Sequence, residues 1–115
     1  MRTAIILAGL LAGQAMAAER RIGAIAATSP TAKNNSTTAV PFTIPATSKI
    51  SIQCDADVFV VVSGESTKLA TNVEVKITAG VLFPTSTPNG AAFVSVLPST
   101  GTANCQVFVR AGNEV

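Results

Sequence analysis

The chain has 115 residues, of which 48% are hydrophobic and only 12% are charged, and its formal net charge is +2. This length fits one domain, and the composition excludes a disordered acidic or basic tail. The sequence contains no His, Tyr or Trp. It therefore lacks the commonest general base and metal ligand, and the aromatic and basic pattern that nucleic-acid binding usually needs. We expect neither an enzyme nor a nucleic-acid-binding protein.

The first residues have the pattern of an export signal. Arg2 provides a positive charge, and residues 3–12 form an apolar stretch that is too short to cross a bilayer of roughly 30 Å as a helix. Ala15-Met16-Ala17 then gives the small-x-small pattern that signal peptidase recognises. We expect residues 1–18 to be a signal peptide. The alternative is an apolar N-terminal helix that is retained and packs against a partner or a membrane, and we expect membrane contact only there.

Residues 19–39 are expected to form an extended arm or linker. From Ile22 to Ala39 the segment is rich in Ala, Thr, Ser and Asn, and it contains Ser29-Pro30 and a polar run over residues 33–38. Asn34 and Asn35 each begin an N-x-Ser/Thr sequon, which a segment of this composition produces by chance, so we give the sequons no weight.

From Val40 onward the apolar residues alternate with a period of two, which is typical of β-strands. Residues 48–54 place Ile50, Ile52 and Cys54 on one face, whereas residues 58–62 are apolar on both faces, as in a central strand. Further runs of this type, separated by Gly- and Pro-rich turns, cover residues 73–78, 80–83, 92–97 and 105–110. Residues 40–115 are therefore predicted to be an all-β domain: a small antiparallel β-sandwich of about seven strands with jelly-roll or immunoglobulin-like topology.

The two cysteines, Cys54 and Cys105, are predicted to form one disulfide. Cys54 shares a strand face with Ile50 and Ile52, and Cys105 shares one with Val107 and Val109, so both point inward. Behind an export signal, such a pair is typical of a bridge. The five Phe residues fall about one per strand, which favours core packing over a ligand-stacking platform.

Candidate chemistry is sparse. Asp55-Ala56-Asp57 spaces two carboxylates as at the start of a Ca²⁺ loop, but Val58-Phe59 follows where the loop needs a third ligand and a glycine. We interpret the two aspartates as turn residues and expect no metal. The sequence has no G-x-S-x-G, phosphate-binding loop or C-x-x-C. We expect no catalytic residue and no cofactor.

Residues 43–60, which contain Ile44-Pro45-Ala46 and then Ile50-Ser51-Ile52-Gln53-Cys54-Asp55-Ala56-Asp57, resemble an opening of small phage and prophage structural proteins. The turn over residues 64–71 and the strand pair over residues 93–104 are similar to later parts of these proteins, so that the resemblance covers about residues 43–110. It implies a capsid-associated β-sandwich of the decoration or minor capsid type, with no catalytic residues. The signal-like N-terminus departs from this pattern.

We therefore expect a non-enzymatic structural protein, a component of a virion. It is expected to assemble with itself and with other virion proteins through the sandwich and the N-terminal arm, with residues 22–45 contacting neighbouring subunits. The alternative is a secreted or periplasmic β-sandwich module for binding or adhesion, in which case the protein is periplasmic or extracellular.

Overall fold

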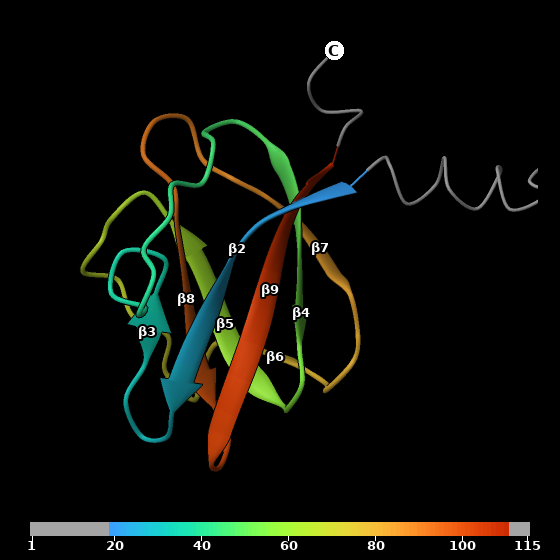
Figure 1. Ribbon diagram of the computed structural model, residues 1–115. Coiled ribbons are helices and arrows are strands. Elements are labelled where there is room, and N and C mark those ends of the chain that lie inside the picture. Colours follow the sequence, from blue (N-terminus) through green and yellow to red (C-terminus); the bar gives the residue numbers. More distant parts are fainter. Residues whose placement is uncertain (1–18, 111–115) are drawn as a thin grey trace, which may run out of the picture.

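The computed structural model describes residues 19–110, and all the regular structure in this part of the chain is β-strand (Figure 1). The strands form two four-stranded antiparallel sheets. Their bounds are β2 (Glu19–Thr28), β3 (Lys33–Asn34), β4 (Lys49–Cys54), β5 (Val58–Ser63), β6 (Val75–Ile77), β7 (Phe83–Ser86), β8 (Phe93–Pro98) and β9 (Thr102–Arg110). This confirms the prediction of an all-β antiparallel fold, with eight strands in residues 19–110 where about seven were expected.

The chain crosses repeatedly between the two sheets. The first sheet has the order β2-β9-β4-β7, and the second has the order β3-β8-β5-β6. Among the strands of residues 19–110, only the connection from β5 to β6 stays within one sheet; every other connection between successive strands passes from one sheet to the other. As a result, β2 and β3 form the edges on one side of the sandwich, and β7 and β6 form the edges on the opposite side.

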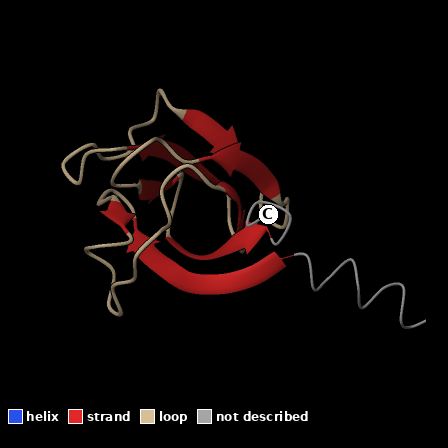
Figure 2. Ribbon diagram, turned by 90° about the horizontal axis from the view of Figure 1, so that it is seen from above, coloured by secondary structure: helices blue, strands red, loops and turns tan. Residues whose placement is uncertain are grey.

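The core lies between the two sheets, which face each other when the molecule is viewed from above (Figure 2). In β4 the alternation predicted from the sequence is present: Ile50, Ile52 and Cys54 are buried and point toward the second sheet. Their main apolar partners come from the paired strand β9 and from the facing strands β5 and β8. They are Val58, Val60, Val94, Val96, Val107 and Val109.

The N-terminal boundary of the sandwich was predicted wrongly. Residues 19–28, expected to belong to a free arm, form β2, which pairs with β9 along its whole length, from Glu19 opposite Arg110 to Thr28 opposite Thr102. Ile25 and Ala27 of this strand are buried in the core, and β3 continues the fold by pairing with β8. The sandwich therefore begins at Glu19 and not at Val40. The predicted signal peptide or apolar helix, residues 1–18, lies outside the described residues.

The strand expected over residues 80–83 is also displaced. It was expected to stop at Pro84, but β7 begins at Phe83 and includes Pro84, which lies opposite Ser51 of β4. A proline is tolerated here because β7 is an edge strand, so that the missing N–H faces away from the sheet without breaking a ladder. Within residues 19–110, no helix has the length and hydrophobicity required to cross a membrane.

Candidate functional site

The disulfide joins the two innermost strands of the first sheet. Cys54 and Cys105 lie directly opposite each other in β4 and β9, and their sulfur atoms are bonded at 2.03 Å. Both residues are buried in the core. The bond is consistent with the predicted pair. It closes a loop between residues 51 positions apart in the sequence, and its burial indicates a structural rather than a reactive role.

The two aspartates beside this bridge bind different partners. The carboxylate of Asp55 accepts hydrogen bonds from the backbone N–H of Asn104 (2.8 Å) and from its side-chain amide (3.3 Å). These bonds, the backbone one first, hold the pKa of Asp55 below its ordinary value. Asp57 accepts a bond from the backbone N–H of Ala79 (2.8 Å) and lies 3.9 Å from the ammonium group of Lys76. Asp55 therefore ties the turn after β4 to β9, and Asp57 ties the same turn to the one after β6, as turn residues do.

The different partners of Asp55 and Asp57 also bear on whether the two carboxylates could bind one Ca²⁺ ion. The two carboxylates are directed at different segments of the chain, one at β9 and the other at the turn after β6. Among residues 19–110, no group of three or more His, Cys, Asp or Glu side chains is placed to hold a metal ion.

Two buried asparagines organise the loop between β3 and β4, and the sequence analysis missed their role. Asn34 is fully buried; its side-chain oxygen accepts bonds from the backbone N–H groups of Ser36 and Thr37, and its amide donates to the carbonyl of Ser66 (2.8 Å). Asn35 donates to the carbonyl of Phe42 (3.0 Å) and accepts from the N–H of Val94. Because both side chains are buried and bonded, neither sequon is accessible in the folded chain.

The loop held by these asparagines covers the edge of β2. The hydroxyl of Thr38 accepts a hydrogen bond from the N–H of Ala26 in β2 (3.2 Å). The ring of Phe42 packs against the core over Gly23 and fills the space that a side chain at position 23 would need. Gly23 follows an irregularity in the pairing of β2 with β9. This side of the sandwich is therefore closed by the chain itself.

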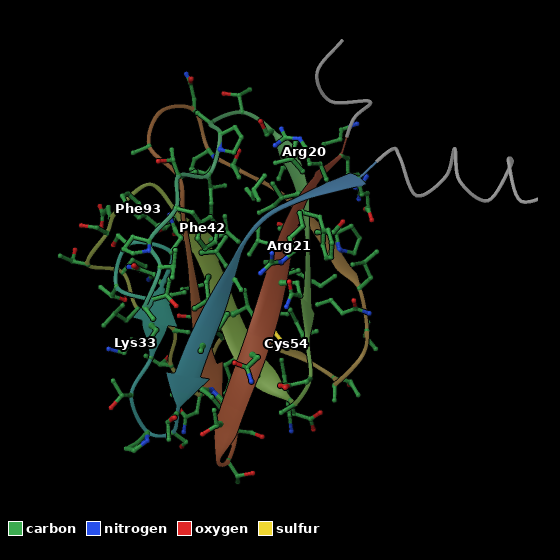
Figure 3. All side chains as sticks on the ribbon, in the orientation of Figure 1. Arg20, Arg21, Lys33, Phe42, Cys54 and Phe93 are labelled. Atoms are coloured by element: carbon green, nitrogen blue, oxygen red, sulfur yellow. A yellow bond between two sulfur atoms is a disulfide. The ribbon has the colours of Figure 1, made fainter. Side chains whose placement is uncertain are left out.

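Phe42 separates two shallow hollows. One has a volume of about 500 Å³ and is lined by Phe42, Phe93 and the segment around Pro45; the labelled rings can be located in Figure 3. The other has a volume of about 430 Å³ and lies between Phe42, Val40 and the start of β2. Their walls are mainly apolar, and among the described residues Arg21 is the one ionisable residue that lines either of them. Both hollows suit an apolar or weakly polar surface contact.

Charged residues at the start of β2 and at the end of β9 interact with side chains of the first sheet. The guanidinium of Arg21 donates to the side-chain carbonyl of Gln106. At the end of β9, Arg110 lies 3.9 Å from the carboxylate of Glu19, which also accepts a bond from the hydroxyl of Ser51 (2.9 Å). These contacts tie β2 to β9 and β4 across the outer face of the first sheet.

The opposite side of the sandwich is open and apolar. Val73 and Val75, before and within β6, are 84% and 56% exposed, and Val81 and Leu82, just before β7, are 49% and 42% exposed. We call these four residues the apolar side patch. Exposed valines are common singly, but a group of them beside a sheet edge is typical of an interaction surface.

Within residues 19–110, the four sheet edges differ in how they are protected. The edge of β2 is covered by the loop around Thr38, and β3 is only two residues long, with the backbone of Asn34 bonded into the following turn. The edge of β7 carries Pro84. The edge strand β6 is also short: it spans only Val75–Ile77, and in the turn before it the N–H of Glu74 donates to the carbonyl of Thr71. Cover, shortness and proline are the usual means of preventing edge-to-edge pairing, so each of these four edges carries one of them.

Comparisons with known proteins give no family for this chain: no protein-family model, no curated protein and no solved structure matches it.

Proposed function

We propose that this chain is a non-enzymatic structural protein, one repeated unit of a multi-copy protein assembly. The observation that carries the proposal is the strand order. Numbered along the chain, the strands run first-eighth-third-sixth in one sheet and second-seventh-fourth-fifth in the other. This is the strand order of a jelly roll, the double-sheet fold of many viral capsid and lectin domains.

The surface of the molecule gives a second line of support. Only 12% of the residues are charged, whereas soluble domains usually carry about twice that fraction. The four exposed residues of the apolar side patch lie beside or within the edge strands β6 and β7. A low surface charge together with a group of exposed apolar side chains favours association of copies over a monomeric state.

The finer proposal is a virion component of the capsid-associated type, either a decoration or a minor capsid protein. It is supported by the resemblance of residues 43–110 to small phage structural proteins and by the jelly-roll order. The route of assembly proposed here differs from the one expected from the sequence. Residues 22–45 were expected to reach neighbouring subunits, but Ile25, Ala27 and Ile44 are buried in their own core. Contacts between copies, and with other virion proteins, therefore use the apolar side patch and the surfaces of the sandwich.

Sedimentation velocity of the full chain between about 1 µM and 1 mM tests this proposal. We expect the weight-average sedimentation coefficient to rise with concentration as copies associate. A coefficient that stays at the monomer value up to 1 mM would remove the physical basis of the building-block function.

A second function, a secreted or periplasmic binding module, is favoured by one specific observation. The hollow beside Phe42 and Phe93 is mainly apolar and shallow, and jelly rolls include carbohydrate-binding domains. Titration of simple saccharides followed by NMR distinguishes the two functions. Shifts confined to residues around Phe42 and Phe93, in a protein that remains a monomer, would favour the binding module.

A further inference from the structure

We propose that Asn89 is a site of spontaneous covalent modification, at which the folded chain converts its own side-chain amide into aspartate or isoaspartate. Asn89 and Gly90 lie in the loop that joins β7 of the first sheet to β8 of the second across one end of the sandwich (Figure 1). They form the one Asn-Gly pair in the sequence. This inference goes beyond the proposed function and does not depend on it.

The reaction joins a backbone nitrogen to the side chain that precedes it. The nitrogen of Gly90 attacks the side-chain carbonyl carbon of Asn89 and closes a cyclic succinimide, and the amide nitrogen leaves as ammonia with the proton from Gly90. Water then opens the ring. Opening at the side-chain carbonyl leaves aspartate, and opening at the backbone carbonyl leaves isoaspartate. Because both reacting atoms of the first step belong to the same chain, attack is intramolecular and water is the only other reactant.

Gly90 leaves the attacking nitrogen unhindered. Its φ is +106°, a conformation that glycine adopts readily and other residues do not, and no atom lies within 4 Å of the place that a Cβ would take. Within residues 19–110 its N–H makes no hydrogen bond. Asn89 and Gly90 are both exposed, so water reaches the site. The fold therefore requires, directly after Asn89, the residue that obstructs ring closure least.

The chain just before Asn89 is held against the loop that leads into β4. The N–H of Thr47 donates to the carbonyl of Pro88 (2.9 Å), and Thr87 and Ser48 exchange hydrogen bonds. Thr47 has a φ of +50°, which is a strained conformation for a β-branched residue. Its hydroxyl donates to the side-chain oxygen of Asn89 (3.4 Å). A donor at this oxygen stabilises the negative charge that develops there during attack.

Three other asparagines in the described part of the chain are protected. Asn34 and Asn35 are buried, and their side chains are bonded within the fold. Asn104 lies in β9, where its side-chain amide donates to the carboxylate of Asp55 (3.3 Å). We therefore expect these three residues to keep their amides in the folded protein.

Asn72 is the matched internal control. It is exposed and lies in a turn, as accessible to water as Asn89. The residue after it is Val73, whose branched side chain stands beside the backbone nitrogen that would have to attack. The N–H of Val73 also donates to the hydroxyl of Thr71 (3.5 Å). Exposure is thus shared by Asn72 and Asn89, whereas an unhindered and unbonded nitrogen is found only after Asn89.

The modification changes the surface beside Phe42 and Phe93. Gly90 lines the hollow next to these rings, and no ionisable residue among the described ones lines it. Either product adds a negative charge at this rim and lowers the formal net charge of the chain from +2 to +1. Isoaspartate also lengthens the backbone of the loop that Thr47 holds. Aged copies therefore present a different surface at this hollow from newly made ones.

Peptide mapping by mass spectrometry tests the site in the full chain. The protein is incubated in mildly alkaline buffer made with heavy-oxygen water, beside a synthetic peptide of residues 84–93 that reports the rate in an unfolded chain. We expect Asn89 of the folded protein to exchange its amide for a labelled carboxylate on the time scale of the peptide, and Asn72 to stay unchanged. An intact amide at Asn89 after the peptide has reacted completely, or equal conversion of Asn72, would overturn the proposal.

Two variants test the roles of the individual groups. Asn89→Gln keeps an exposed amide, but its longer side chain closes a ring far less readily, so the labelled mass gain is expected to disappear; a gain of the same size would show that another residue reacts. Thr47→Val removes the hydroxyl and keeps a branched side chain, so conversion of Asn89 is expected to slow by about 2- to 10-fold. Equal rates in the parent and in Thr47→Val would contradict the assistance by Thr47. Far-ultraviolet circular dichroism confirms that each variant keeps its strand content.

Discussion

Replacing Gly23 by alanine introduces a methyl group where the ring of Phe42 already lies. A Cβ at position 23 would be 2.3, 2.4 and 2.6 Å from three ring atoms of Phe42. Non-bonded carbons are stable at about 3.5–4.0 Å, so the ring must move by roughly 1 Å. The backbone of Phe42 is held on both sides by Asn35, through bonds of 3.0 Å to its N–H and its carbonyl. The ring must therefore rotate out toward a flanking hollow.

The expected loss of stability comes from overpacking around position 23. Inserting a methyl group into a packed site usually destabilises a protein by about 1–3 kcal/mol. For a domain of this size, each kcal/mol lowers the melting temperature by roughly 4–8 °C. Because the chain has no Trp or Tyr, scanning calorimetry is the suitable assay. Phe42→Ala provides the control: Gly23→Ala should cost little in that background, since the obstructing ring is absent.

Additive effects of the two substitutions would contradict the contact between Gly23 and Phe42. If Gly23→Ala lowers the melting temperature equally with and without Phe42→Ala, the two residues are not in contact. An unchanged melting temperature for the single variant would also show that the ring does not occupy this space.

Three further predictions concern the interior and the loops. Asn34→Ala should destabilise the fold by about 1–3 kcal/mol, because it removes the buried side chain that accepts from the N–H groups of Ser36 and Thr37 and donates to the carbonyl of Ser66; an unchanged calorimetric midpoint would contradict this. Replacing Cys54 and Cys105 together by alanine should cost about 4 kcal/mol in the chain-entropy model for a closed loop of this length, and a denaturant midpoint equal to that of the parent would show that the bridge is dispensable. The lowered pKa of Asp55 means that its bonds to Asn104 stabilise the fold above its ordinary value of 3.8 and that this contribution is lost as pH falls below it. Asp55→Ala should therefore be less stable than the parent at pH 7 and should approach it near pH 2, and a gap that is independent of pH would argue against this role.

The parts of the fold that were predictable are those with large alternating apolar residues. In β4, Ile50, Ile52 and Cys54 identified the buried face directly. In β2 the same alternation exists, with Ile25 and Ala27 buried and Ala26 exposed, but most of these side chains are small. Because most of its side chains are small, the inward-facing and outward-facing positions of β2 differ little in hydrophobicity, and its composition resembles that of a linker.

The contacts of the candidate site could not be predicted, because they join residues that are far apart in the sequence. Asn34 and Asn35 were interpreted as part of a polar linker, because a single sequence does not reveal that Ser66 and Val94 supply their partners. The position of β6 at the edge of its sheet likewise depends on which strands are neighbours, because a strand becomes an edge only through the order of the whole sheet.

The proposed function requires that this chain works as one of many copies. Native mass spectrometry of the protein, isolated without denaturation from the cells or particles that produce it, tests this most directly. We expect complexes whose masses contain several copies of the chain, alone or with other structural proteins. A mass corresponding to a single copy, with no associated protein, would contradict it.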